Sequence, residues 1–154
     1  LKLYVSDVER YKNHKINLLK NNFVKREKVG AGDVSNLLFM LAYHDIYLLF
    51  DYIKNFKIKE VRVHSTKENL HFEVNYEEAQ IDFLYMLQCE KKTHHINDCN
   101  LTNNKDALKE MLTCVLNNKV NFEYNRKAAL FTNHFIDSIK DKIFKKGEAC
   151  LKQY

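Results

Sequence analysis

Four cysteines are the residues of this chain with the most evident chemistry. They are Cys89, Cys99, Cys114 and Cys150, separated by 9, 14 and 35 residues. An even number of cysteines is typical of a disulfide-stabilised protein. We predict the bridges Cys89–Cys99 and Cys114–Cys150, each of which would add about 2–4 kcal/mol to the free energy of unfolding. The alternative is a set of free, partly buried thiols in a protein of a reducing compartment.

A metal site is a further possibility for the same region. Cys89, His94, His95 and Cys99 follow one another as C-x4-H-H-x3-C, and Cys114 could supply another ligand. Zinc takes thiolate and imidazole ligands in a tetrahedron. This spacing is not one of the usual finger or ribbon spacings, and no glycine-containing knuckle surrounds it. We therefore predict no bound metal and no other cofactor.

The remaining ionisable residues form no catalytic motif. The other histidines are His14, His44, His64, His71 and His134, and none stands in an H-E-x-x-H frame. His44 adjoins Asp45 in an apolar stretch, so a hydrogen-bonded core histidine is expected there. With only three glycines, the chain has no phosphate-binding loop. The adjacent Glu77 and Glu78 would not face each other on a helix. We predict a protein without enzymatic activity.

Charge is distributed unevenly along a chain of net charge +5. Residues 1–28 and 125–154 carry net charges of +5 and +4, whereas residues 29–124 carry −4. If the two ends form adjacent helices, they share a basic face that could bind an acidic protein or another polyanion. The residues of this predicted basic face are Lys25, Arg26, Lys142, Lys145 and Lys146. Nucleic acid is a poor candidate partner, because base and phosphate recognition favours arginine and only four arginines are present.

Helical periodicity is the dominant pattern of the chain. A capping box from Ser6 to Glu9 predicts a helix that runs to about residue 28. Glycines at positions 30 and 32 interrupt it, and residues 34–56 form the most apolar segment. Asp45, Asp51 and Lys54 in that segment make a membrane span unfavourable. We predict instead a central helix that the other helices surround.

The helical period of the apolar residues gives way once to a period of two, in a stretch where apolar and polar residues alternate. Residues 58–64 and 70–74 predict a β-hairpin with a five-residue loop. Helices are expected again at residues 76–91, 105–117 and 126–146, the last ended by Gly147, with a polar loop at residues 93–103 and a connector or short strand at 120–124.

Together these patterns predict one mainly α-helical domain over residues 1–154. About five helices would pack around the central apolar helix, with one β-hairpin near residues 58–74. Because the chain begins with leucine, we expect a processed product or a cloned domain. The favoured function is a secreted or cell-surface binding protein with two disulfides, for example one that acts on a host protein or polyanion. The alternatives are a cytoplasmic adaptor, of viral or other origin, with free thiols and an apolar groove, and a carrier of a small apolar ligand. The pattern does not indicate an oligomeric state.

Overall fold

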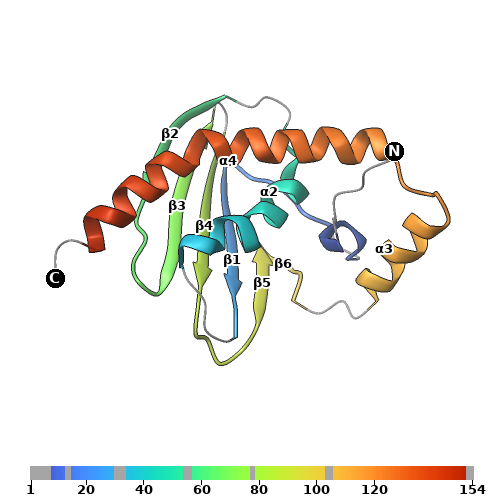
Figure 1. Cartoon of the computed structure of the whole chain (residues 1–154), viewed down its shortest axis with the longest axis horizontal. Helices are drawn as coiled ribbons and strands as arrows, with labels where there is room; N and C mark the ends of the chain where they lie inside the picture. The colour runs from blue at the N-terminus through green and yellow to red at the C-terminus, as the bar shows by residue number, and fades with distance from the viewer. Residues whose placement is uncertain are drawn as a thin grey trace.

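A six-stranded mixed sheet forms the centre of the protein (Figure 1), with the strand order β2-β3-β4-β1-β5-β6. The computed structural model describes residues 8–12, 15–29, 34–53, 57–76, 79–102 and 106–151. Its strands are β1 (Asn21–Glu27), β2 (Ile58–Val63), β3 (Asn69–Tyr76), β4 (Ala79–Met86), β5 (Thr93–Ile96) and β6 (Cys99–Asn100). Strands β1 and β4 pair in parallel, and the other neighbours pair antiparallel.

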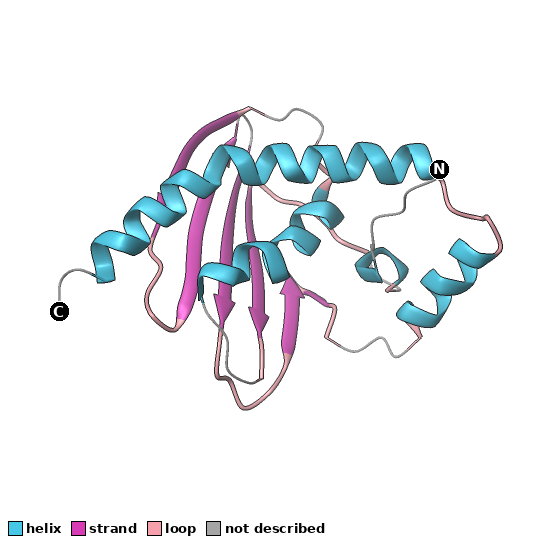
Figure 2. Ribbon diagram, viewed as in Figure 1, coloured by secondary structure: helices cyan, strands magenta, loops and turns pink. Residues whose placement is uncertain are grey.

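Helices cover one face of this sheet (Figure 2). The first is continuous over residues 34–49 and consists of α1 (Val34–Leu37), the π-helical turn η2 (Leu38–Ala42) and α2 (Tyr43–Leu49). The second is α4 (Phe122–Leu151), which crosses the sheet beside α2. The 3₁₀ helix η1 (Val8–Tyr11) and α3 (Ala107–Leu116) contact each other at one end of the sheet. Among the described residues, no helix has both the length and the hydrophobicity needed to cross a membrane.

The core lies between the covered face of the sheet and these two helices. Alternate side chains of β3 and β4 point into it, and Phe72 and Phe83 stack there with ring centroids 4.8 Å apart. Phe135 of α4 meets Phe83 edge-to-face at 6.2 Å, which joins the helix to the sheet. The opposite face has no described helix on it, and we call it the uncovered face. The fold is therefore a two-layer α+β arrangement.

The prediction of a mainly helical bundle is wrong, because two of its helices are strands. Residues 21–27 form β1, whose inward positions are Asn22, Val24 and Arg26. Two of these three are polar, so the alternation typical of a half-buried strand was hidden. The capping box at Ser6 falls partly outside the described residues, and Glu9 lies in η1.

The second error concerns residues 76–91. Strand β4 carries apolar side chains on both faces, with Phe83 and Tyr85 inward and Leu84 and Met86 on the uncovered face. Such a run resembles a buried helix in sequence. Full antiparallel pairing with β3 and parallel pairing with β1 fix it as a central strand. The predicted loop at 93–103 likewise contains β5 and β6.

Other predicted elements are present with altered limits. The hairpin is confirmed as β2 and β3, and the helix predicted at 105–117 is α3. Asn118 follows α3 with φ of 52°, a left-handed conformation that commonly ends a helix. The last helix starts at Phe122 and continues past Gly147 to Leu151. The apolar helix ends at Leu49, and it covers the sheet instead of lying at the centre of a bundle.

Candidate functional site

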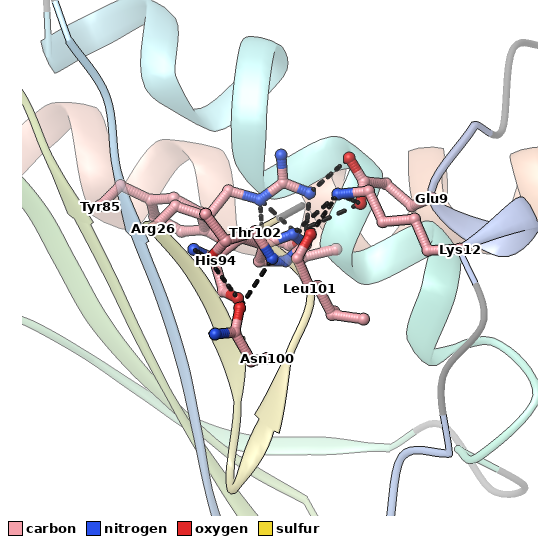
Figure 3. A network of polar contacts seen from close by, with 9 residues as sticks. Glu9, Lys12, Arg26, Tyr85, His94, Asn100, Leu101 and Thr102 are labelled. Carbon is pink, nitrogen blue, oxygen red and sulfur yellow. Dashed lines mark hydrogen bonds and ion pairs between the residues drawn. The ribbon is translucent and has the colours of Figure 1, made fainter. Parts of the chain in front are cut away.

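A cluster of charged side chains lies between the sheet and the helix α2 (Figure 3). Arg26 comes from β1, Asp45 from α2, Tyr85 from β4, His94 from β5 and Glu9 from η1. We call these five residues the Arg26 cluster. The inward positions of three adjacent strands place Tyr85, Arg26 and His94 side by side, because Arg26 pairs in register with both other residues.

Asp45 is the centre of this cluster. The guanidinium of Arg26 donates from Nε to Oδ2 at 2.9 Å and from Nη2 to Oδ1 at 2.6 Å. The Tyr85 hydroxyl donates to Oδ2 at 3.1 Å, and Nε2 of His94 lies 2.8 Å from Oδ1. Asp45 itself is 0% exposed. A carboxylate can be buried this deeply only when charged and hydrogen-bonding partners compensate for its lost hydration.

Glu9 extends the cluster toward the N-terminal segment. Its Oε1 accepts from Nη2 of Arg26 at 3.1 Å, and its Oε2 lies 2.6 Å from Nζ of Lys12. Lys12 also donates to the main-chain oxygen of Leu101 at 2.8 Å (Figure 3). The main-chain nitrogen of His94 donates to Thr102 Oγ1 at 2.9 Å. These contacts tie η1, β1, β5 and the segment after β6 to one another.

The surroundings fix the charge of the two carboxyl groups. Burial alone would raise the pKa of Asp45, but the charge of Arg26 and the adjacent His94 lower it below its usual value. Burial opposes ionisation of Glu9 as well, and contacts with His94, Arg26 and Lys12 depress its pKa strongly. Burial, together with the charge of Asp45, raises the pKa of Tyr85 well above 10. The cluster therefore holds two carboxylates, a guanidinium and a neutral phenol.

A histidine in contact with an aspartate resembles the base and orienting group of a hydrolase. Here His94 is 2% exposed and Asp45 is fully buried, so a substrate cannot reach either group in this conformation. The cluster joins segments that are far apart in sequence, and its evident role is structural. Sequence analysis missed Arg26 as an inward residue, whereas the isolated acid Asp45 within an apolar helix was a usable signal of a buried partner.

A different feature of the surface suits recognition. Three leucines of α3, which we call the α3 ridge, follow one another at intervals of four residues and project into solvent. Leu108, Leu112 and Leu116 are 55%, 48% and 81% exposed. The neighbouring side of the helix is buried through Ala107 and Met111, and α3 packs there against η1. The ridge is therefore a second apolar side of the helix, in addition to the one that anchors it.

The predicted disulfides are not formed. Cys89, Cys99 and Cys114 are free thiols, and the side chain of Cys150 lies outside the described residues. Cys89 follows β4, and its main-chain nitrogen bonds Lys28 beyond the end of β1. Cys99 pairs in register with Ile96, which is level with Val24. Cys89 is thus level with Lys28 and Cys99 with Val24, four residues away along the same chain segment, which is a distance of about 13 Å. The Cα atoms of a disulfide lie only about 4.4–6.8 Å apart.

The residues of the predicted basic face are not brought together by the described structure. Lys25 and Arg26 are neighbours in a strand, so they point to opposite faces of the sheet. Lys25 lies on the uncovered face, 2.8 Å from Glu27, while Arg26 is buried. Lys142 and Lys145 are exposed on α4, and the Lys146 side chain is outside the described residues. Anion binding by these α4 lysines stays a prediction.

The cysteine–histidine motif does not surround one point either. His94 faces the Arg26 cluster, and His95, the next residue of β5, faces the other side of the sheet. A single ion could not accept both imidazoles together with Cys89 and Cys99.

Comparison with protein-family models, curated proteins and solved structures finds no match for this chain. Its function is therefore inferred from its own surface and charge arrangement.

Proposed function

We propose that this chain is a non-catalytic protein-binding domain that inserts the α3 ridge into a hydrophobic groove of a partner protein. The observation that supports this most directly is the exposure of Leu108, Leu112 and Leu116 along one line of α3. Isolated exposed leucines are common on protein surfaces, but contiguous exposed apolar patches mark interaction sites. The Arg26 cluster is buried between the sheet and α2, which also favours binding over catalysis.

The spacing of the α3 ridge indicates the kind of partner. Residues at i, i+4 and i+8 form a continuous line on a helix, and helices of this kind bind with that line in an apolar groove. Residues 106–119 contain two acidic and two basic residues, so the segment has no net charge. Electrostatic attraction should therefore contribute little, and the affinity should depend weakly on salt concentration.

The free thiols bear on where such a domain would work. Disulfides persist in oxidising compartments, whereas thiols such as Cys89, Cys99 and Cys114 are typical of reducing ones. This supports the adaptor alternative over the secreted binding protein. The partner of such an adaptor could also be a host protein.

A basic surface at Lys142 and Lys145 of α4 is the second candidate for a binding surface, because both lysines are exposed.

A capture experiment with the full chain tests this proposal. The chain would be immobilised and exposed to extract from the cells that produce it, at low and at high salt, and the bound proteins would be quantified by mass spectrometry. Leu112→Glu/Leu116→Glu would place two charges on the α3 ridge. We expect the double variant to lose a specific partner that the wild type retains at both salt concentrations.

Leu130→Glu is the matched control, because Leu130 is also an exposed leucine (57%) but lies on α4. It should capture the same partner as the wild type. A photo-crosslinking residue at position 109, beside the α3 ridge, should label that partner, and one at position 130 should not. Equal capture by the double variant and the wild type would refute the proposal. Self-association that the double variant abolishes would identify a second copy of the chain as the occupant.

A further inference from the structure

Three potential metal ligands lie together on the uncovered face of the sheet, and a fourth side chain borders one of them. Glu73 of β3 and Asp82 of β4 are direct partners in the antiparallel register. His71 is two residues before Glu73 and therefore shares its face. One ligand atom from each of these three residues lies within 4.8 Å of the other two. Within the described part of the chain, they are the only group of three histidine, cysteine or acidic residues arranged in this way.

His64 is the fourth member. Its main-chain nitrogen donates to the carbonyl oxygen of His71 at 2.8 Å, so the two residues are opposite each other across β2 and β3. Their imidazole rings are 5.1 Å apart, and Nε2 of His64 lies 3.5 Å from Oε1 of Glu73. Ser65 Oγ pairs with both main-chain polar groups of His71, which holds the start of the hairpin loop at this point.

The distances suit a small ion. Zinc binds histidine nitrogen and carboxylate oxygen at about 2.0–2.2 Å in a tetrahedron, which places the ligand atoms about 3.3 Å from one another. The separation of 3.5 Å between His64 and Glu73 is already close to this value. His71 Nε2 and Asp82 Oδ1 are 2.7 Å apart, a hydrogen-bond distance. An ion would replace the shared proton there and widen this contact by roughly half an ångström.

Charge gives an independent reason to expect a cation. Like charges directly opposite each other on neighbouring strands are destabilising, and Glu73 and Asp82 form such a pair. A divalent ion would balance both carboxylates. Arg62 is a neighbouring cation, but its Nη2 bonds Glu60 at 2.8 Å, and its Nη1 lies 3.9 Å from Oε2 of Glu73. That contact leaves Oε1 of Glu73 directed at His64.

The ligand types select the ion. Imidazole nitrogen favours zinc and other transition metals, whereas calcium and magnesium prefer sites built only from oxygen. The side chains of His71, Glu73 and Asp82 are 29%, 20% and 30% exposed, so an ion could enter from solvent without unfolding. All three stand on hydrogen-bonded strands, which hold their main chains in place before the ion binds.

We propose that His64, His71, Glu73 and Asp82 form a binding site for one divalent transition-metal ion, with zinc the expected occupant. We call it the His71 site. His71 and Glu73 lie on β3, Asp82 lies on β4 and His64 directly follows β2, so the site is separate from the α3 ridge. Either proposal can therefore fail without affecting the other.

Titration of the full chain with zinc tests the His71 site. The thiols would first be blocked with a reversible alkylthio reagent, because free cysteines bind zinc by themselves. Isothermal titration calorimetry at neutral pH should give one zinc per chain. Cobalt in place of zinc should give the visible absorption of a tetrahedral site without a sulfur-to-metal charge-transfer band.

Substitution assigns the ligands. His71→Asn should weaken zinc binding by about tenfold or more, since even groups that only orient a ligand contribute about 10–100-fold. Asp82→Asn should weaken it similarly and changes the side-chain volume little. His95→Asn is the matched control, a histidine of β5 on the same face outside the site, and its affinity should equal that of the wild type. Absence of saturable zinc binding in the folded, thiol-blocked chain, or unchanged affinity in both His71→Asn and Asp82→Asn, would overturn the proposal.

Discussion

Arg26 and Asp45 form a bidentate ion pair between the sheet and α2, with nitrogen–oxygen distances of 2.9 Å and 2.6 Å. Asp45 is 0% exposed and Arg26 is 8% exposed. Burying two charges costs several kcal/mol of hydration for each ion, and their attraction offsets this only while both are present. The pair therefore contributes little net stability by its presence but makes the fold sensitive to the loss of either member.

Replacement of Asp45 by asparagine should expose this dependence. Asp45→Asn would leave the Arg26 charge buried with Glu9 as its remaining acidic neighbour, and we expect the free energy of unfolding to fall by about 3–5 kcal/mol. Urea denaturation followed by circular dichroism measures the change. Asp137→Asn is the control, because Asp137 pairs with Lys140 on the surface, and its loss should cost less than about 1 kcal/mol. Equal effects of the two substitutions would contradict the structural role of the Arg26 cluster.

The same cluster predicts the response of the protein to acid. The pKa values of Glu9 and Asp45 are lower in the folded protein than in the unfolded chain. The unfolded chain therefore binds protons more readily as the pH falls, and acid favours unfolding. The stabilisation should be complete above about pH 4, near the unfolded pKa values, and should decline below it.

Glu9→Gln distinguishes this cause from general acid denaturation. The variant has one fewer carboxylate to protonate, so its free energy of unfolding should depend less steeply on pH below about pH 4. Glu123→Gln, at an exposed ion pair with Lys127, serves as the comparison. Thermal unfolding across the acid range gives both slopes. A Glu9→Gln slope as steep as that of the wild type would show that Glu9 is not held in its ionised form.

Sequence periodicity identified the elements whose burial pattern is simple. Strand β3 of the hairpin alternates regularly, and α3 and α4 have the helical period. Strand β1 was missed because Arg26 occupies an inward position that is normally apolar. Its acceptors, Asp45 and Glu9, are distant in sequence, and although the isolated Asp45 indicates a buried partner, no local pattern identifies that partner as Arg26. Local periodicity cannot reveal a strand that depends on buried tertiary ion pairs.

The candidate sites illustrate the same limit. The α3 ridge follows from the sequence once the helix is assigned, because Leu108, Leu112 and Leu116 are spaced by four. That these leucines are exposed does not follow from the sequence, since a line of apolar side chains on a helix normally faces the core. The His71 site depends on the pairing of Glu73 with Asp82. That pairing could not be anticipated while residues 76–91 were assigned to a helix.

The state of the cysteines can be measured directly. Without reductant, an alkylating reagent should modify Cys89, Cys99 and Cys114, which are partly exposed free thiols. The intact mass of the alkylated protein should be the same with and without prior reduction. Peptide mapping would identify each modified residue. Additional alkylation that appears only after reduction would reveal a disulfide and contradict the free-thiol state.

Substitutions in the covering helix test how it packs on the sheet. Ile46 is 0% exposed, so Ile46→Ala should lower the free energy of unfolding by about 2–5 kcal/mol. Leu41→Ala should cost less, because Leu41 is only partly buried. Leu130→Ala, at an exposed helical position, should change it by no more than about 0.5 kcal/mol. Denaturant unfolding gives all three values, and an unchanged midpoint for Ile46→Ala would contradict the packing of α2.

The lysines near the end of α4 provide the test that separates two modes of binding. Lys142→Ala/Lys145→Ala/Lys146→Ala removes three charges without requiring a change of backbone, since alanine favours helices. If these lysines attract a polyanion, the wild-type chain should bind immobilised heparin, and binding should decline steeply above about 0.15 M salt. We expect the triple variant to elute at lower salt than the wild type while keeping its melting temperature.

Lys140→Ala controls for the loss of any positive charge from α4. Lys140 already pairs with Asp137 at 2.7 Å, so its removal should affect heparin retention less than removal of Lys142 or Lys145. The α3 ridge variant should behave in the opposite way, losing its protein partner at every salt concentration and keeping its heparin retention. Identical elution of the triple variant and the wild type would eliminate the basic surface. Loss of the protein partner in the triple variant would mean that α4 and not α3 is the binding element.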